Sequence, residues 1–97
     1  MNVVIVHHTV ANYDTWKSAY DAHEPARRAN GCTSATVTRA PSAADGSTEV
    51  TIAMDFPNAD AAKGFLDDRG LAEAMKAAGV VGIPDIRITE LVESTSY

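Results

Sequence analysis

The stretch VVIVHHTVANYDTWKSAYDAH, residues 3–23, decides the fold because a strand pattern passes directly into a helix pattern within it. Residues 3–10 form a β-branched run that stays apolar on both alternating faces until the two histidines, which is typical of a strand buried on both sides. Asn12 follows and belongs to the residue types that cap helices. We therefore expect a first strand over 3–10 and a helix that begins after Asn12.

The expected helix has an aromatic face. Its apolar positions recur at spacings of three and four residues, the period of one helix face. These positions are Tyr13, Trp16, Ala19, Tyr20, His23 and Ala26. Pro25 lies inside this pattern, where it lacks a backbone donor and clashes with the preceding turn, so it predicts a kink or a restart within residues 22–24. The Asn30-Gly31 pair predicts the end of the helical segment.

Further strand and helix patterns follow along the chain. We expect strands over 33–39, 49–56 and 86–92, with a Pro, Gly and Ser-rich hairpin loop before the second of these and the loop VVGIP before the last. Asn58 predicts the start of a helix over 59–69, which Gly70 ends or bends. A short helix over 71–78 is expected to stop at Gly79.

The order of these elements predicts an α+β, ferredoxin-like βαββαβ fold in which helices cover one face of an antiparallel four-stranded sheet. The chain of 97 residues has the length of one domain, so we expect a single domain over residues 1–97. The second sheet face also carries apolar residues and needs a cover. This favours a symmetric homodimer that packs sheet against sheet.

The composition argues against several classes of partner. The formal net charge is −5 and the Lys and Arg residues are scattered, so no basic stripe is available for nucleic acid. No apolar stretch reaches the length of a membrane span, and the N-terminus lacks the pattern of a signal peptide; we expect no membrane contact and a cytoplasmic location. Cys32 is the only cysteine, which excludes an intramolecular disulfide and a cysteine metal cluster.

Three stretches carry a resemblance to a known superfamily: HTVANYDTWKSAYDAH (8–23), RRANG (27–31) and FLDDRGLAEAMKAAGVVGIPDI (65–86). Together they resemble the small dimeric α/β-barrel proteins of the antibiotic-biosynthesis-monooxygenase-like superfamily over nearly the whole chain. The resemblance implies a ligand between the helices and the sheet of each protomer, in a barrel that the partner subunit closes. That superfamily includes monooxygenases, haem-degrading enzymes, isomerases and cyclase-like proteins, so fold analogy alone does not choose among activities.

From this resemblance we expect a small-molecule enzyme of the cofactor-free monooxygenase or cyclase-like type, acting on an aromatic or polyketide-like substrate without a bound metal or flavin. The route requires a positioned base and a dry pocket, because the substrate must become an electron-rich anion before it reacts with oxygen. The alternative is a non-catalytic dimeric ligand-binding or stress-related protein, and haem binding is a third option. An enzyme should have a cavity of several hundred Å³ beside the base, whereas the alternative predicts a packed, hydrogen-bonded histidine.

His8 and His23 are the candidate catalytic residues. Adjacent side chains of a strand project to opposite faces, so His7 and His8 cannot both line one pocket, and the resemblance points to His8 as the base. A buried, hydrogen-bonded core histidine is the competing interpretation. His23 shares a helix face with Trp16 and Tyr20, but distances along the helix and strand make Trp16 and Tyr20 the closer neighbours of His8.

Trp16, Tyr20, Arg39 and Asp55 are the candidate substrate-binding residues. The two aromatic side chains would stack on an aromatic ligand, or simply pack helix against sheet. Arg39 ends the second strand and Asp55 lies on the less apolar face of the third; each would face an anionic or phenolic substrate, or join a surface ion pair. The isolated histidines have no recognised metal-ligand spacing, so we expect no metal site.

Overall fold

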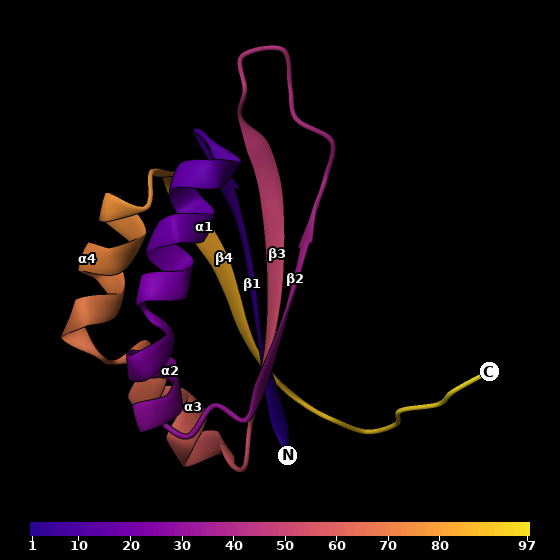
Figure 1. Ribbon diagram of the computed structural model, residues 1–97. Helices are drawn as coiled ribbons and strands as arrows, with labels where there is room; N and C mark the ends of the chain where they lie inside the picture. The colour runs from indigo at the N-terminus through magenta and orange to yellow at the C-terminus, as the bar shows by residue number, and fades with distance from the viewer.

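The computed structural model describes residues 1–97, with strands and helices in the order β1-α1-α2-β2-β3-α3-α4-β4 (Figure 1). The strands are β1 (Asn2–Val10), β2 (Ser34–Arg39), β3 (Thr48–Phe56) and β4 (Val80–Glu90). The helices are α1 (Tyr13–Ala22), α2 (Glu24–Ala29), α3 (Ala59–Leu66) and α4 (Arg69–Ala77). The expected α+β class and element order are confirmed.

The strands form one antiparallel sheet in the order β2-β3-β1-β4, with β3 and β1 at its centre. Because β3 lies between β1 and β2, the connection through α1 and α2 forms a split βαβ unit, the ferredoxin-like arrangement. All helices lie on one side of the sheet and the other side is open in a single chain (Figure 1).

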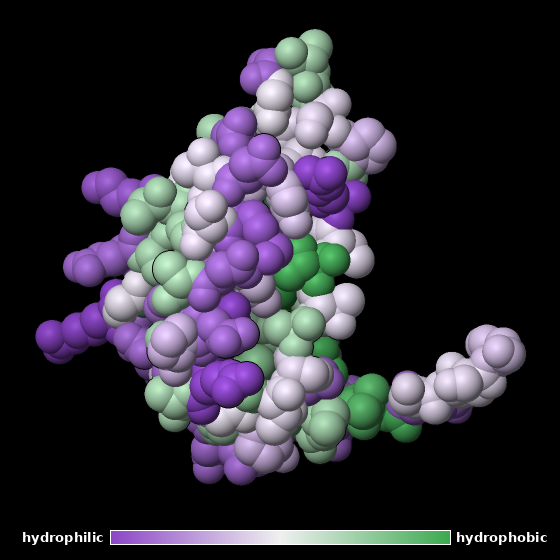
Figure 2. Space-filling model, viewed as in Figure 1, coloured by the Kyte–Doolittle hydropathy of each residue, from purple (hydrophilic) through white to green (hydrophobic).

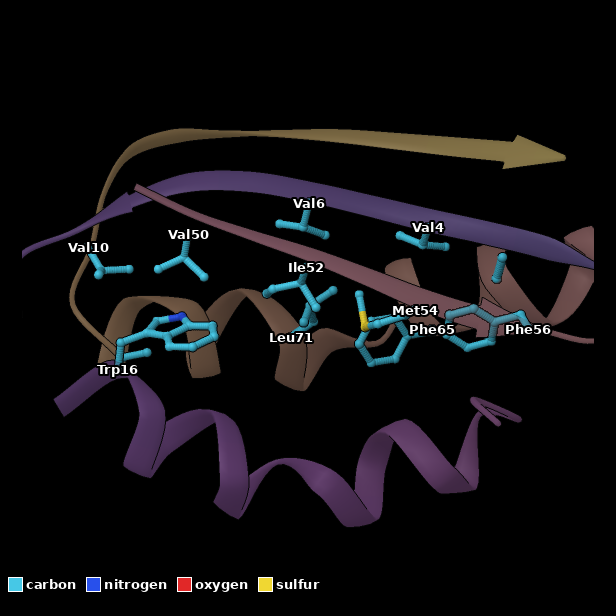
Figure 3. Close-up of a cluster of buried hydrophobic side chains, with 12 residues drawn as sticks. Val4, Val6, Val10, Trp16, Val50, Ile52, Met54, Phe56, Phe65 and Leu71 are labelled. Atoms are coloured by element: carbon cyan, nitrogen blue, oxygen red, sulfur yellow. The ribbon is translucent and has the colours of Figure 1, made fainter. Parts of the chain in front are cut away.

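The core lies between the helices and the two central strands (Figure 3). Side chains alternate along each strand, so every second residue of β1 and β3 faces the helices. The inward cross-strand pairs are Val4 with Met54, Val6 with Ile52, His8 with Val50 and Val10 with Thr48, and all of these residues are buried. Trp16, Phe65 and Leu71 pack against them from the helices. The outward side of β1 has no such cover, so the expected burial of β1 on both faces is not met within one chain.

The first helical segment breaks where Pro25 requires it. The Asn12 side chain caps α1 by accepting a hydrogen bond from the Thr15 amide at 3.0 Å. His23 then lies between α1 and α2, and Pro25 occupies the first turn of α2, where a missing amide donor costs little. Gly31 ends the segment with a φ of +95°, a conformation that favours glycine. The prediction of a restart near residues 22–24 is confirmed.

The boundary between α3 and α4 differs from the expectation of one helix over 59–69. α3 ends at Leu66, and Asp68 begins α4 by accepting a hydrogen bond from the Gly70 amide at 2.9 Å. Gly70 therefore lies in the first turn of α4 and does not end α3. The capping preference of aspartate at this position outweighed the continuous helical pattern.

β4 also begins earlier than expected, because residues 80–84 belong to the strand and not to a loop. His7 pairs with Asp85 and Thr9 pairs with Val81, so the segment 82–84 forms a bulge opposite His8. Gly82 takes a φ of +75° in this bulge. Glycine and proline mark bulges as well as loops, which is why the sequence pattern suggested the wrong element.

Apolar side chains remain exposed on the sheet side of the molecule. Figure 2 shows hydrophobic colours there and at the start of the C-terminal segment, whereas the helical side is mostly hydrophilic. The exposed residues include Val81, Ile83, Leu91 and Val92. No helix in the structure is both long enough and apolar enough to cross a membrane.

We expect Asn12→Ala to lower the free energy of unfolding by about 1 kcal/mol, because the Thr15 amide loses its acceptor. Asn12→Ser keeps a side-chain oxygen and should remain close to the wild type. Urea unfolding followed by the fluorescence of Trp16, the only tryptophan, measures both. Superimposable curves for Asn12→Ala and the wild type would show that tertiary packing alone sets the start of α1.

Candidate functional site

A small cavity of about 50 Å³ lies between the helices and the sheet. His8 and Ile52 line it from the sheet, Trp16, Tyr20 and His23 line it from the first helical segment, and apolar side chains of α3 and α4 complete it. A water needs about 10–15 Å³, so the space exceeds one water, but it is well below the several hundred Å³ of ordinary small-ligand sites. The cavity is thus small and mostly apolar.

His8 is the most unusual residue of this cavity. Its side chain points inward from β1, it is only 4% exposed, and neither ring nitrogen has a hydrogen-bond partner. A buried polar atom without a partner costs free energy and is uncommon in native structures. His8 is therefore packed without being satisfied, unlike a hydrogen-bonded core histidine.

Burial sets the protonation state of His8. Removal from water disfavours the imidazolium cation, and the neighbouring His7 adds a smaller repulsion, so the pKa of His8 falls below its ordinary value of 6.5. The ring is consequently neutral at neutral pH. A neutral imidazole has one nitrogen that accepts a proton and one that donates a hydrogen bond.

A stack of side chains runs from His8 along the first helical segment. Trp16 meets the His8 ring edge-on, with centroids 5.7 Å apart, and Tyr20 stacks on Trp16 at 4.9 Å. The guanidinium carbon of Arg27 lies 3.7 Å from the centroid of the Tyr20 ring. The expected neighbours of His8 are Trp16 and Tyr20; Trp16 contacts its ring, whereas Tyr20 follows as the next ring of the stack.

Arg27 belongs to the site but was not among the residues singled out from the sequence. It is 6% exposed, and its Nη1 donates a hydrogen bond to the Tyr20 carbonyl oxygen at 2.7 Å. The available signal was its spacing, because Arg27 follows His23 by four residues and so continues the aromatic face across the break at Pro25. A helix break normally interrupts such a face, so the spacing alone did not assign Arg27 to the same face as Tyr20 and His23.

His23 reaches the same cavity from the junction of α1 and α2. Its Nε2 is buried and has no hydrogen-bond partner, and its ring lies 6.3 Å from that of Phe65. The structure thus brings four of the six predicted site residues to one cavity: His8, His23, Trp16 and Tyr20.

Arg39 and Asp55 lie outside the cavity. The guanidinium of Arg39 packs over the Tyr13 ring at 4.2 Å. Asp55 pairs with Val3 on the open face of the sheet, and its carboxylate accepts a hydrogen bond from the Ser34 hydroxyl at 2.6 Å. The strand register sends Asp55 to the side opposite the helices, so it cannot meet His8 within one chain.

No cluster of three or more His, Cys, Asp or Glu side chains is arranged to hold a metal ion. Cys32 lies near the first helical segment, where its thiol donates a hydrogen bond to the Ser34 carbonyl oxygen at 3.3 Å. Burial raises the pKa of this thiol, which keeps it protonated and makes it a poor nucleophile.

Comparison with known proteins relates the chain to others through its fold. No family model and no curated protein sequence matches it. Among solved structures, a protein named as a candidate antibiotic biosynthesis monooxygenase from Deinococcus radiodurans is 16% identical, with a TM-score of 0.67 over 100% of this chain and 98% of the other. SnoaB from Streptomyces nogalater, described as a cofactor-independent oxygenase, is 14% identical, with a TM-score of 0.70 over 96% and 95%.

The same fold also occurs without a natural function. The de novo designed protein Foldit4 is 15% identical, with a TM-score of 0.63 over 94% of this chain and 98% of the design. Structural similarity at this level of sequence identity therefore shows that the folds agree, but it does not show that the activities agree. The chain has the ferredoxin-like fold shared by the antibiotic biosynthesis monooxygenase-like proteins.

Proposed function

We propose that this chain is a small-molecule enzyme of the cofactor-free monooxygenase or cyclase-like type, with His8 as the base and an aromatic or polyketide-like substrate in the cavity beside it. The observation that carries the proposal is the buried His8 ring, whose two nitrogens have no partner in an apolar cavity. A fold that needed His8 only for packing would be better served by an apolar side chain. The fold shared with SnoaB, a described oxygenase, adds support.

The chemistry begins with a proton transfer. The neutral His8 ring accepts a proton from an acidic ring CH₂ or hydroxyl group of the substrate, which leaves an electron-rich anion. In the monooxygenase reaction, dissolved O₂ takes electrons from this anion and binds the ring carbon as a peroxide anion, which takes the proton back from His8 to become a hydroperoxide. Loss of water then leaves a ketone at that carbon, so one oxygen atom enters the product and the other leaves as water. The ring carbon, oxidised by four electrons, is the only reductant required.

The cavity must widen before it accepts such a substrate. A cavity of about 150 Å³ accepts benzene, three times the volume found beside His8. Met75 and Tyr20 line the cavity and are only partly buried, and methionine adapts readily because its side chain is unbranched. We infer that displacement of these side chains opens the site, with Trp16 remaining as the fixed wall.

We also propose that the chain works as a homodimer. Half-buried Val3, Ile5 and Ala53 lie on the open face of the sheet, and exposed Val81 and Ile83 lie on β4. A second sheet packed on this face would remove their apolar surface from water. Such packing would also close the barrel that the resemblance implies.

A non-catalytic ligand-binding protein is the second candidate function, and the volume of the cavity favours it. About 50 Å³ is the space expected of a pocket filled mainly by core side chains. The two candidate functions differ in what happens to a bound aromatic compound, because only an enzyme converts the compound or consumes oxygen with it.

A panel of phenolic and polycyclic aromatic compounds tests the proposed function. We expect at least one to raise the melting temperature of the wild type, since a ligand that binds only the folded state stabilises it. We further expect this compound to drive oxygen uptake that falls at least about 100-fold in His8→Leu, as general-base catalysis contributes at least that factor. Stabilisation without oxygen uptake or a converted product would support the non-catalytic function.

The unsatisfied ring of His8 gives a prediction for stability. His8→Leu should raise the free energy of unfolding by about 1 kcal/mol or more, because it removes two buried nitrogens that have no partner. His8→Gln keeps buried polar atoms and should show no such gain. Urea unfolding at neutral pH measures the difference. A loss of stability in His8→Leu would indicate that His8 serves the core.

The lowered pKa of His8 makes stability depend on pH. Between the folded pKa and the ordinary value of 6.5, the unfolded chain binds more protons than the folded chain, so the free energy of unfolding rises with pH through this window. The stabilisation is complete above 6.5 and is lost as pH falls through the folded pKa. We expect the free energy of unfolding, measured with urea at several pH values across this range, to rise less steeply with pH in His8→Leu than in the wild type. An equal pH dependence in the two proteins would contradict the lowered pKa of His8.

A further inference from the structure

A second hollow adjoins the cavity beside His8 and shares the Tyr20 and Arg27 side chains with it. Its volume is about 430 Å³ and its walls are mostly polar, with Lys17, Asp21 and Arg28 among them. Tyr20 and Arg27 line both this polar hollow and the cavity beside His8. The two side chains therefore border a polar space and an apolar one at the same time.

The charges around the polar hollow leave one cation without a counter-ion. Lys17 pairs with Asp21 at 2.6 Å, and Arg28 pairs with Glu24 at 3.8 Å. Arg27 takes part in no ion pair, although it is the only buried residue with a permanent charge. Its stacking on Tyr20 and its hydrogen bond to a carbonyl oxygen offset only part of the cost of burying a cation.

The guanidinium of Arg27 is also held in place. Stacking on the Tyr20 ring fixes its plane, and the bond from Nη1 to the Tyr20 carbonyl oxygen fixes its rotation. A guanidinium has five N–H donors in a rigid fork, so one backbone bond leaves others for a ligand. This fork matches a planar carboxylate better than it matches a single oxygen.

We propose that Arg27 binds the carboxylate of an aromatic acid whose ring lies in the cavity beside His8. The polar hollow would hold the solvated acid group, and the apolar cavity would hold the ring. The inference rests on the proposed function only for the location of the ring, and it assigns Arg27 to ligand binding and not to the chemical step. Because the chain has a net charge of −5, its overall charge repels anions, and we assign the selectivity to Arg27, the one cation of the hollow that has no ion-pair partner.

Calorimetric titration of the full chain with 2-naphthoate and 2-naphthamide tests the inference. The two probes share a ring system and differ in charge. We expect the acid to bind the wild type at least about tenfold more tightly, since hydrogen bonds between charged groups are the strong ones. This preference should vanish in Arg27→Met and weaken in Arg27→Lys, which supplies a point charge without the fork. It should persist in the control Arg69→Met, which removes an exposed arginine of α4 that lines neither the polar hollow nor the cavity.

Equal affinities of the wild type for the two probes would overturn the inference and leave the proposed function standing. A preference for the acid that survives in Arg27→Met would overturn it as well, because another cation would then be the cause. Binding of neither probe would also overturn it, and oxygen uptake would decide the proposed function separately. If urea unfolding shows that Arg27→Met does not fold, the inference is still tested by the two affinities of the wild type and by the weaker preference expected in Arg27→Lys.

Discussion

The pairing of β1 with β3 is the constraint on which the other features depend. Its register places His8 opposite Val50 on the helix-facing side of the two central strands. A slip of one residue would turn His8 outward and bring His7 into the core. Three neighbouring cross-strand pairs of apolar or buried residues hold the register, so the packing of the sheet itself keeps an unsatisfied imidazole buried. Helix α1 then covers His8 with Trp16.

Much of this arrangement is readable from the sequence, because it follows from local rules. The period of two in residues 3–10 and 49–56 predicts the central strands, and Asn12 and Pro25 predict where the helices start and restart. The bulge at 82–84 and the position of Arg27 between the cavity and the polar hollow are not predicted from the sequence. The bulge arises from the pairing of β4 with β1, which are far apart in the sequence, so no local pattern encodes it. Arg27 does continue the helical spacing of Tyr20 and His23, but the break at Pro25 interrupts that pattern and the stacking on Tyr20 appears only in the fold.

The site concentrates polar groups that a stability-driven core would avoid. His8 and His23 bring buried nitrogens without partners, and Arg27 brings a buried charge without a counter-ion, all around one apolar space. Violations of packing rules that gather at one place are typical of functional sites. The designed protein with the same backbone arrangement shows that the fold itself is attainable without a natural activity.

The break at His23 divides the wall of the site between two short helices. Trp16 and Tyr20 lie on α1, whereas Arg27 lies on α2, and only the junction joins the two helices in the chain. The stacking of Arg27 on the Tyr20 ring and its hydrogen bond to the Tyr20 carbonyl oxygen both cross this junction and brace the two helices against each other. Loss of the Arg27 side chain would therefore remove a brace between α1 and α2 as well as a charge.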